Sequence, residues 1–214
     1  MNEEIISKAI TFAKSHHLGV DPSHDWWHVW RVYRLAIQIA KQENADVFIV
    51  SIAALLHDVD DRKLVGDEKA KALYNVRYFL AENNVSKENS EKVIDIISSM
   101  SYKGSGVDST MYTIEGACVQ DADRLDAMGA VGIARCMTYT GVVGREIFNP
   151  EISPVQHQSY EAYKNSKGTA INHFYEKLLL LKDRLNTATA KEMGRKRHDF
   201  MEAYLSQFFH EIEF

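Results

Sequence analysis

The sequence predicts an all-α protein, a single-domain helical bundle that spans residues 1–214. The chain contains only three prolines, all at or before residue 154, so long stretches are free to form helices. Apolar residues recur with the period of an amphipathic helix in several segments. We find no convincing alternation of polar and apolar residues, the pattern typical of a half-buried β-strand.

Five helices are expected in the first half of the chain, over residues 2–17, 24–43, 47–56, 67–82 and 87–100. Ser23 or Asp25 can cap the second helix, Asp46 the third and Ser86 the fifth. The segment 47–56 is interpreted as a helix rather than a strand because it is at least ten residues long and includes two consecutive alanines.

Three more helical segments are expected, one that starts at Thr113 and two others over residues 171–185 and 193–208. Residues 141–154, with two glycines and two prolines, form the longest non-helical stretch, either a plain connection or a lid over a pocket. We expect a metal-site core over about residues 20–140, with the C-terminal helices of residues 155–212 packed on it.

Composition limits the classes of partner. The net charge is -5 and the longest basic run is Arg195–Arg197, which argues against nucleic-acid binding. Cys118 and Cys136 stand alone, a pattern that suits a reducing compartment and argues against disulfides and a thiolate zinc site. The sequence contains no apolar run long enough to span a membrane and no basic signal peptide, so a cytoplasmic location is expected.

The most informative stretch follows an apolar segment, residues 47–56, in which Ser51 is the only polar residue. Such a segment must be buried, so it carries His57 and Asp58 into the core or to its rim. A buried carboxylate is costly unless it is paired or bound to a metal ion. The His-Asp dipeptide occurs three times in the chain, but only this copy ends a buried segment. We therefore predict a metal site here.

Two further side chains are candidates for the same site. His28 opens an apolar helix stripe that continues through Val32, and Asp123 shares a helix face with Val119, Ala127 and Ala130. Each has a structural alternative, because a buried histidine can bind a backbone carbonyl and Asp123 can pair with Arg124 or Arg135.

Taken together, His28, His57, Asp58 and Asp123 come from three separate helices, as a metal site in a bundle core requires. Two imidazoles with two carboxylates suit a divalent ion such as Mn²⁺, Fe²⁺, Co²⁺, Ni²⁺ or Zn²⁺ better than Ca²⁺, which prefers oxygen alone. Mg²⁺ is retained as a further candidate.

This pattern resembles the H…HD…D signature of the HD-domain metal-dependent phosphohydrolases. The resemblance extends to HDWWHVWRV at residues 24–32, LLHDVDDRK at 55–63, QDADRLDAMGAVGIAR at 120–135 and NHFYEKLLLLKD at 172–183. It covers nearly the whole chain and is closest to the small, stand-alone bacterial HD hydrolases. The Gly-Tyr-Pro motif of the cyclic-dinucleotide phosphodiesterase branch is absent from the sequence.

The resemblance also implies roles for individual residues. The family's last aspartate lies in an A-D-x-L context, which selects Asp123 as the ligand over Asp121 and Asp126. Several members carry an acid three residues after the HD aspartate, a position that Asp61 occupies here. The pair His16-His17 lies too far back in the pattern to be counted among the ligands.

The resemblance implies a phosphohydrolase that uses a metal-activated water molecule on a nucleotide. Asp61 would orient the water or accept its proton. Lys63, Lys103 and Arg135, in that order, are candidates to bind the phosphates, although Arg135 has an ion pair within the protein as an equal alternative.

The reaction would convert a (d)NTP to a monophosphate and pyrophosphate, or remove phosphate from a nucleoside monophosphate. Two non-enzymatic alternatives remain open: an HD module that senses a nucleotide without turnover, and a helical structural protein whose histidines and acids are satisfied core groups.

Overall fold

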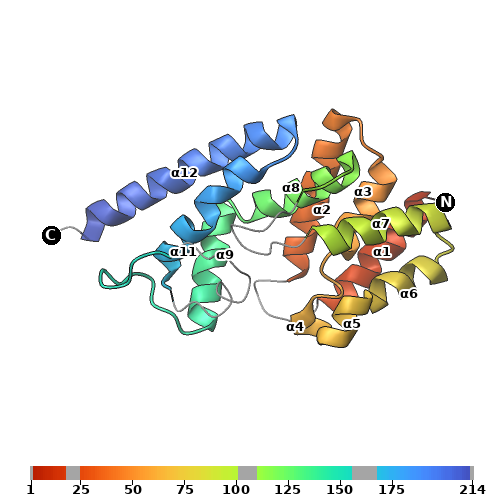
Figure 1. Ribbon diagram of the computed structural model, residues 1–214, viewed down its shortest axis with the longest axis horizontal. Coiled ribbons are helices and arrows are strands. Elements are labelled where there is room, and N and C mark those ends of the chain that lie inside the picture. The colour runs from red at the N-terminus through yellow and green to blue at the C-terminus, as the bar shows by residue number, and fades with distance from the viewer. Residues whose placement is uncertain (1, 18–24, 101–109, 156–167, 213–214) are drawn as a thin grey trace. The chain divides into compact units, whose positions relative to one another are not determined.

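The computed structural model describes residues 2–17, 25–100, 110–155 and 168–212, without the side chains of Arg62 and Lys63 (Figure 1). All regular elements in these ranges are helical, which confirms the all-α class. The elements are α1 (Asn2–His16), α2 (Trp26–Glu43), α3 (Val47–Leu56), α4 (Arg62–Val65), α5 (Asp67–Ala72), α6 (Tyr74–Glu82), α7 (Lys87–Ser99), α8 (Ile114–Asp126), α9 (Gly129–Val142), α11 (Ala170–Glu176), the 3₁₀ helix η2 (Leu178–Arg184) and α12 (Ala188–Ile212).

The chain divides into two compact units, and the boundary falls inside α8. The first unit comprises residues 1–101 and 110–122, and the second comprises residues 102–109 and 123–214. The expectation of one domain over the whole chain, with a metal-site core and packed C-terminal helices, stays a prediction.

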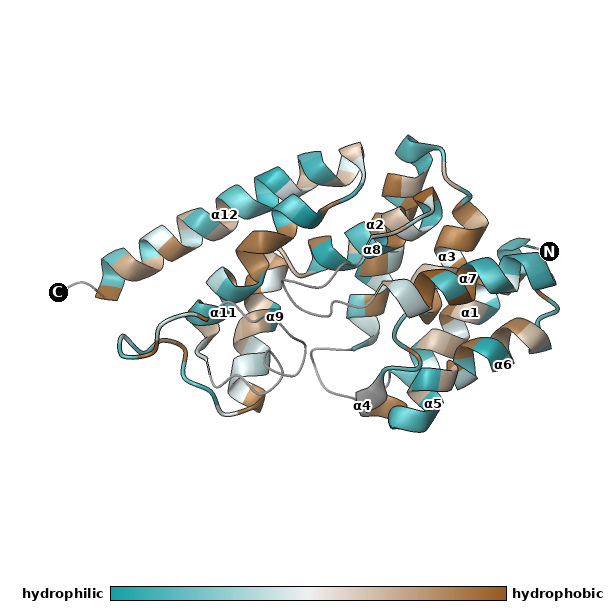
Figure 2. Ribbon diagram, viewed as in Figure 1, coloured by the Kyte–Doolittle hydropathy of each residue, from teal (hydrophilic) through white to brown (hydrophobic). Residues whose placement is uncertain are grey.

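Helix α3 is the core of the first unit. It packs against α1, α2 and α7, and every residue from Ile49 to Leu56 is buried. In Figure 2 its hydrophobic segments are brown and lie among these three helices. Ser51, the single polar residue, donates its hydroxyl hydrogen to the carbonyl of Val47 at 2.6 Å, so its burial leaves no unpaired donor. The predicted burial of this segment is thereby confirmed.

Side-chain caps fix where the main helices begin. Asp25 accepts a hydrogen bond from the amide of His28 at 2.8 Å, so α2 starts at Trp26, two residues later than expected. Asp46 accepts from the amides of Phe48 and Ile49, and Ser86 caps α7 through the amide of Asn89. The predicted caps at Asp25, Asp46 and Ser86 are confirmed.

Three expected helices are interrupted, two of them next to a residue with a positive φ. The helix expected over 67–82 breaks at Leu73, which has a left-handed φ of 48° and ends α5. The helix expected from Thr113 ends at Asp126 and restarts at Gly129, where φ is 68°. The helix expected over 171–185 becomes η2 after Lys177.

The second of these breaks corrects an expected helix face. Because α8 ends at Asp126, Ala127 and Ala130 do not extend the face that carries Val119 and Asp123. Ala130 is in fact exposed, near the start of α9.

In the second unit, α12 packs on α9 and on η2, and α11 packs on the same two elements. The fully buried Phe174 of α11 stacks on Tyr204 of α12, with ring centroids 5.8 Å apart. The face predicted for the last helix is only partly correct. Met201 is buried as expected, but Phe200 is 52% exposed, and Gly194, His198 and Leu205 of α12 are buried instead.

The predicted non-helical stretch begins after Val142, two residues later than expected, and is bonded to the start of α11. The carbonyls of Glu146 and Ile147 accept hydrogen bonds from the amides of Ala170 and Ile171, at 3.1 and 3.0 Å. The side-chain amide of Asn172 donates to the carbonyl of Ile152 at 2.8 Å. These bonds give the stretch a role as a connection that holds the first turn of α11; a role as a lid stays a prediction.

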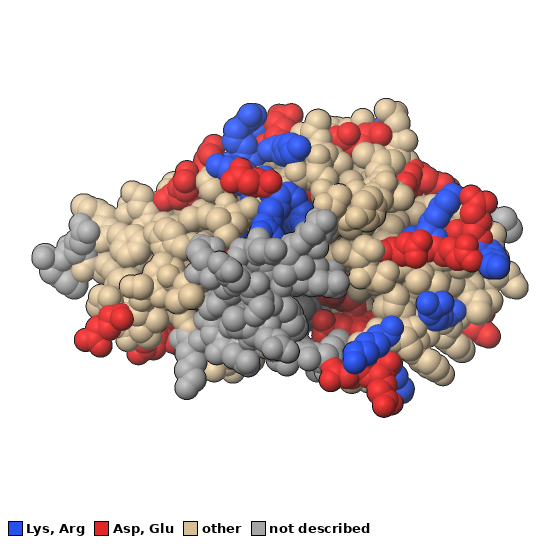
Figure 3. Space-filling model, in the orientation of Figure 1, with Lys and Arg blue, Asp and Glu red and all other residues tan. Residues whose placement is uncertain are grey.

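Charged side chains of both signs are interspersed on the face in view in Figure 3. On α7 they form ion pairs one helical turn apart, such as Lys92 with Glu88 at 2.7 Å. No helix within the described ranges is both long and apolar enough to cross a lipid bilayer.

Candidate metal centre

The first candidate ligand, His28, lies in the opening turn of α2. It is the third residue of the helix, and its side chain is 2% exposed. The bond between its own amide and the Asp25 carboxylate fixes the helix start, and with it the position from which the imidazole extends. Local capping therefore sets the place of the first ligand.

The second and third candidates follow the buried helix α3, as the sequence predicted. His57 is the C-cap residue of α3, and Asp58 begins the turn that follows. In this turn the amide of Val59 donates to the carbonyl of Leu56 at 3.2 Å, and the amide of Asp61 donates to the carbonyl of Asp58 at 3.0 Å. These bonds hold the backbone of the His-Asp pair in place.

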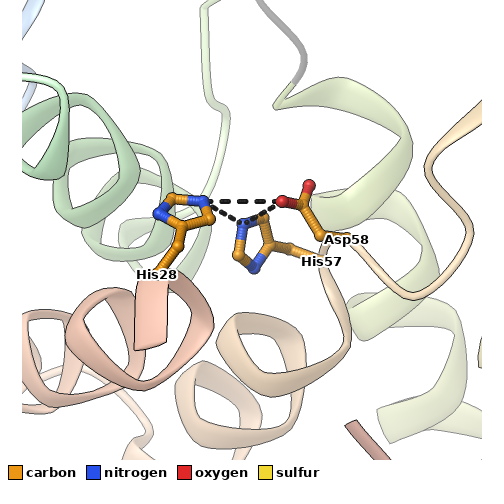
Figure 4. Close-up of side chains that lie close together, drawn as sticks. All are labelled: His28, His57 and Asp58. Carbon is orange, nitrogen blue, oxygen red and sulfur yellow. Dashed lines mark hydrogen bonds and ion pairs between the residues drawn. The ribbon is translucent and has the colours of Figure 1, made fainter. Parts of the chain in front are cut away.

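The three side chains converge (Figure 4). Nε2 of His57 lies 3.4 Å from Nε2 of His28, and Oδ2 of Asp58 lies 3.5 Å from His28 and 3.4 Å from His57. The histidine side chains are almost fully buried, whereas that of Asp58 is 16% exposed. The three potential ligand atoms thus form a nearly equilateral triangle that is partly open to solvent.

The hydrogen bond made by Nδ1 of His57 determines which nitrogen of the ring carries the proton. Nδ1 donates a hydrogen bond to the carbonyl of Ala54 at 2.8 Å, because a carbonyl can only accept. In the neutral ring Nε2 then carries a lone pair toward His28 and Asp58. Backbone carbonyls commonly orient metal-binding histidines in this way.

The spacing of the triangle fits a divalent metal ion. Ligands at the corners of a tetrahedron with bonds of about 2.1 Å lie about 3.4 Å apart, close to the separations of 3.4 and 3.5 Å seen here. One carboxylate and two imidazole nitrogens also form a mixed donor set that suits borderline divalent ions. His28, His57 and Asp58 could therefore hold a metal ion, whose identity their geometry leaves open.

Asp123, the expected fourth ligand, belongs to the second unit, on the part of α8 beyond the unit boundary. Its side chain is half-buried. Its role as a ligand stays a prediction.

The predicted catalytic and phosphate-binding residues differ in how far the structure describes them. Asp61 is half-buried, and its carbonyl accepts hydrogen bonds from the amides of Leu64 and Val65, so it precedes α4 as a fixed backbone position. Lys63 lies in α4, but its side chain is outside the described atoms, and Lys103 is outside the described residues altogether. The roles of all three stay predictions.

Arg135 forms an ion pair within the second unit. Its guanidinium lies 2.9 Å from Oδ2 of Asp126, a carboxylate that is 2% exposed. This pair is the structural alternative that the sequence left open for Arg135. Phosphate binding by Arg135 stays a prediction, although its guanidinium also serves to neutralise a buried acid.

His17 is a further residue near the triangle that the sequence analysis set aside. The pKa of His17 is lowered, chiefly by burial. The His57 and His28 rings also lower this pKa, whereas the hydrogen bond to Ala13 and the charge of Asp58 raise it. His17 is therefore within electrostatic range of all three residues. A helical signal was present in the sequence, because His17 continues a buried stripe of every fourth residue formed by Ile5, Ala9 and Ala13.

Comparisons with known proteins bear on the family to which the chain belongs. A family model of the HD domain matches residues 26–128. YpgQ of Bacillus subtilis is 43% identical over 86% of this chain and 82% of its own length. A structure of an HD-superfamily hydrolase from Bacillus thuringiensis is 40% identical and superposes with a TM-score of 0.77, over 99% of this chain and 98% of its own. The chain belongs to the HD superfamily of hydrolases.

Two further structures of similar proteins bear on the fold and on ligands. A Lactobacillus plantarum protein with 39% identity superposes with a TM-score of 0.87 over 98% of this chain and 97% of its own. YpgQ was crystallised in complex with ADP, and that structure matches with a TM-score of 0.77 and 37% identity over 97% of this chain and 98% of its own. The HD match spans His28, His57, Asp58 and Asp123, whereas Arg135 lies beyond its end.

Proposed function

We propose that this HD hydrolase is a metal-dependent phosphohydrolase that acts on a nucleotide, with the conversion of a (d)NTP to a monophosphate and pyrophosphate as its first candidate reaction. The observation that carries the proposal is the triangle of ligand atoms from His28, His57 and Asp58. The HD family and the ADP complex of YpgQ support it.

In this proposal His28, His57 and Asp58 bind the metal ion, and Asp123 adds a second carboxylate. A bound divalent ion would lower the pKa of a water molecule toward about 7 and polarise a phosphoryl oxygen. The Ala54 carbonyl keeps the His57 ring in the tautomer that presents a lone pair at Nε2. The partial exposure of Asp58 leaves one side of the triangle accessible to water and substrate.

Asp61 is proposed to orient the attacking water or to take its proton. It follows the His-Asp pair within the same hydrogen-bonded turn, because its amide donates to the Asp58 carbonyl at 3.0 Å. A carboxylate held so close in the chain to a ligand is well suited to accept a proton from the water.

Cationic side chains are proposed to bind the phosphates, because negative charge spreads over the phosphoryl oxygens in the transition state. Lys63 is the first candidate since it lies two residues after Asp61, and Lys103 is the second. Arg135 is the last of the three because it already pairs with Asp126.

The substrate class rests on chemistry and on the relative's ligand. ADP, the ligand of the YpgQ structure, carries the phosphoanhydride that a pyrophosphate-releasing enzyme would cleave in a triphosphate. A nucleoside monophosphate phosphatase would use the same metal-bound water but would release orthophosphate. The two reactions therefore differ in product rather than in the ligand triangle.

The test is a matrix of nucleoside mono-, di- and triphosphates, in ribo and deoxy forms, against Mn²⁺, Co²⁺, Ni²⁺, Zn²⁺ and Mg²⁺, with pyrophosphate and orthophosphate measured separately. Asp58→Asn should abolish turnover and metal retention. The matched control is Asp199→Asn, because Asp199 is exposed and follows His198 in another His-Asp pair of the chain. This control should retain wild-type turnover.

Each outcome has a defined meaning. Pyrophosphate from triphosphates supports the first candidate reaction, and orthophosphate from monophosphates supports the phosphatase. Tight nucleotide binding without product from any metal would favour the sensing module. Protein that retains no stoichiometric metal, with the same metal content in His57→Ala, would contradict the metal-dependent proposal altogether.

A further inference from the structure

His17 ends the buried stripe of α1 with a nitrogen atom that lacks a hydrogen-bond partner. The residue is 2% exposed, and its Nδ1 donates to the carbonyl of Ala13 at 2.8 Å. Its Nε2 is fully buried and has no partner among the described residues. A buried polar atom without a partner is destabilising and therefore requires an explanation.

The hydrogen bond of Nδ1 determines what Nε2 can bind. Because Nδ1 carries the proton donated to Ala13, Nε2 of the neutral ring has a lone pair and can only accept. Burial favours the neutral ring by lowering the pKa of His17. A phosphate oxygen is also an acceptor, so it cannot fill this position. The atom requires an O–H or N–H donor, or a cation.

The surroundings of His17 indicate which donor is available. Helix α1 packs on α3, the helix whose C-cap residue is His57, and both helices lie in the first unit. The charge of Asp58 and the rings of His57 and His28 all act on His17. His17 is nevertheless outside the set of ligand atoms that lie within 4.8 Å of one another. It is therefore close to the triangle without being part of it.

We propose that Nε2 of His17 accepts a hydrogen bond from a water molecule bound to the metal ion that His28, His57 and Asp58 hold. This role gives the buried nitrogen a donor and gives the water a fixed orientation. This proposal rests on the proposed function, which supplies the metal ion, and it adds His17 as a residue that positions the water. A well-oriented nucleophile lowers the barrier to attack, whereas substrate affinity does not depend on its orientation.

Two variants of His17 separate its two nitrogens. His17→Asn retains a side-chain amide that can donate to the Ala13 carbonyl, and it deletes the group at Nε2. His17→Gln places an amide oxygen near the position of Nε2, so it can still accept from the water. Comparison of the two variants tests the accepting atom rather than the presence of a histidine.

The neighbouring residue supplies a matched control. His16 makes the same type of bond as His17, from Nδ1 to the carbonyl of Phe12 at 2.8 Å, but it is only half-buried. His16→Asn therefore makes the same chemical change at the same helix end. It should leave kcat, KM and metal content unchanged.

We expect His17→Asn to lower kcat by about 10- to 100-fold, as is typical when a partner just outside the metal ligands is removed. KM and metal stoichiometry should remain within about twofold of the wild type, because this role touches the water alone. His17→Gln should recover part of kcat. A kcat for His17→Asn equal to that of His16→Asn would overturn the proposal, and so would loss of the metal, which would make His17 a ligand.

A crystal structure of the wild-type protein with Mn²⁺ gives a readout that does not depend on catalysis or on the folding of a variant. We expect an oxygen atom bound to Mn²⁺ within hydrogen-bond distance of Nε2 of His17. Direct Mn–Nε2 coordination, or a donor elsewhere in the protein bound to Nε2, would overturn the proposal. If the protein binds Mn²⁺ in this way but hydrolyses no nucleotide, the proposed function fails and the assignment of His17 stands.

Discussion

The carboxylate of Asp60 accepts a hydrogen bond from the backbone amide of Val76, at 2.9 Å. A second bond, from the amide of Asn75, is 3.1 Å long, and Asp60 itself is 5% exposed. Both amides belong to the first turn of α6, whose preceding residue, Leu73, offers no side-chain cap. An acid from the turn after the His-Asp pair therefore caps a helix fifteen residues later in the chain.

This contact predicts a structural role for Asp60. Asp60→Ala should lower the free energy of unfolding by about 1.5–3 kcal/mol, because it leaves two amides without their charged acceptor. Urea unfolding measures the change. Asp60→Asn retains one acceptor oxygen and should lose less. Equal stabilities of the wild type and Asp60→Ala would show that water replaces the carboxylate without loss.

The adjacent acid should behave in the opposite way. Asp61→Asn should reduce kcat by about 10²- to 10⁴-fold, the usual contribution of a general base. Its urea midpoint and metal content should match those of the wild type. Steady-state kinetics with the best nucleotide of the panel measure the effect. If Asp61→Asn retained wild-type kcat, Asp61 would have no part in proton transfer.

Asp123→Asn tests the fourth ligand. We expect this change to raise the dissociation constant for Mn²⁺ by at least about tenfold, because a neutral amide replaces an anionic oxygen ligand. Isothermal titration calorimetry of metal-free protein measures the constant. Asp199→Asn controls for the loss of one negative charge from the chain. The same affinity in both variants would restrict the ligands to His28, His57 and Asp58.

The lowered pKa of His173 predicts that the protein loses stability in acid. Burial, with Lys177 and Arg145 nearby, lowers its pKa from 6.5 to about 3. Above about pH 6.5 the ring is neutral in both the folded and the unfolded chain, so proton binding by His173 does not reduce the stability of the fold. As the pH falls below that value, the unfolded chain takes up a proton that the folded chain does not.

The free energy of unfolding should therefore fall between about pH 7 and pH 5. His173 contributes at most about 2 kcal/mol to this fall, and partial exposure of the residue makes its contribution smaller. Urea midpoints at the two pH values measure the fall, and His173→Gln should reduce it. An identical pH dependence in both proteins would exclude His173 as its source.

The sequence predicted the parts of the fold that depend on periodicity and caps. The ten residues from Val47 to Leu56 and the cap at Asp46 were read correctly because an apolar run needs burial and its first amides need an acceptor. The convergence of His28 with His57 and Asp58 was likewise predicted, since each was placed at an inward or terminal helix position. The role of Asp123 as a fourth ligand stays a prediction.

Tertiary contacts account for what the sequence could not supply. Asp60 caps α6 from outside the helix, so α6 can begin after Leu73 although the local pattern favours one continuous helix. His17 was set aside because it lies too far back in the sequence pattern. That reason failed because distance along the chain is a poor guide to distance in a bundle. Its stripe with Ile5, Ala9 and Ala13 showed burial, but the partner of a buried stripe is known only once the helices are packed.

The contact between His57 and Ala54 has a consequence for protein engineering. The last four carbonyls of a helix lack partners inside it, and Nδ1 of His57 uses one of them in α3. If α3 were elongated by another turn, the amide of residue 58 would occupy that carbonyl and leave the imidazole free to rotate. A designer who transplants this His-Asp pair into another scaffold must therefore transplant the helix terminus with it.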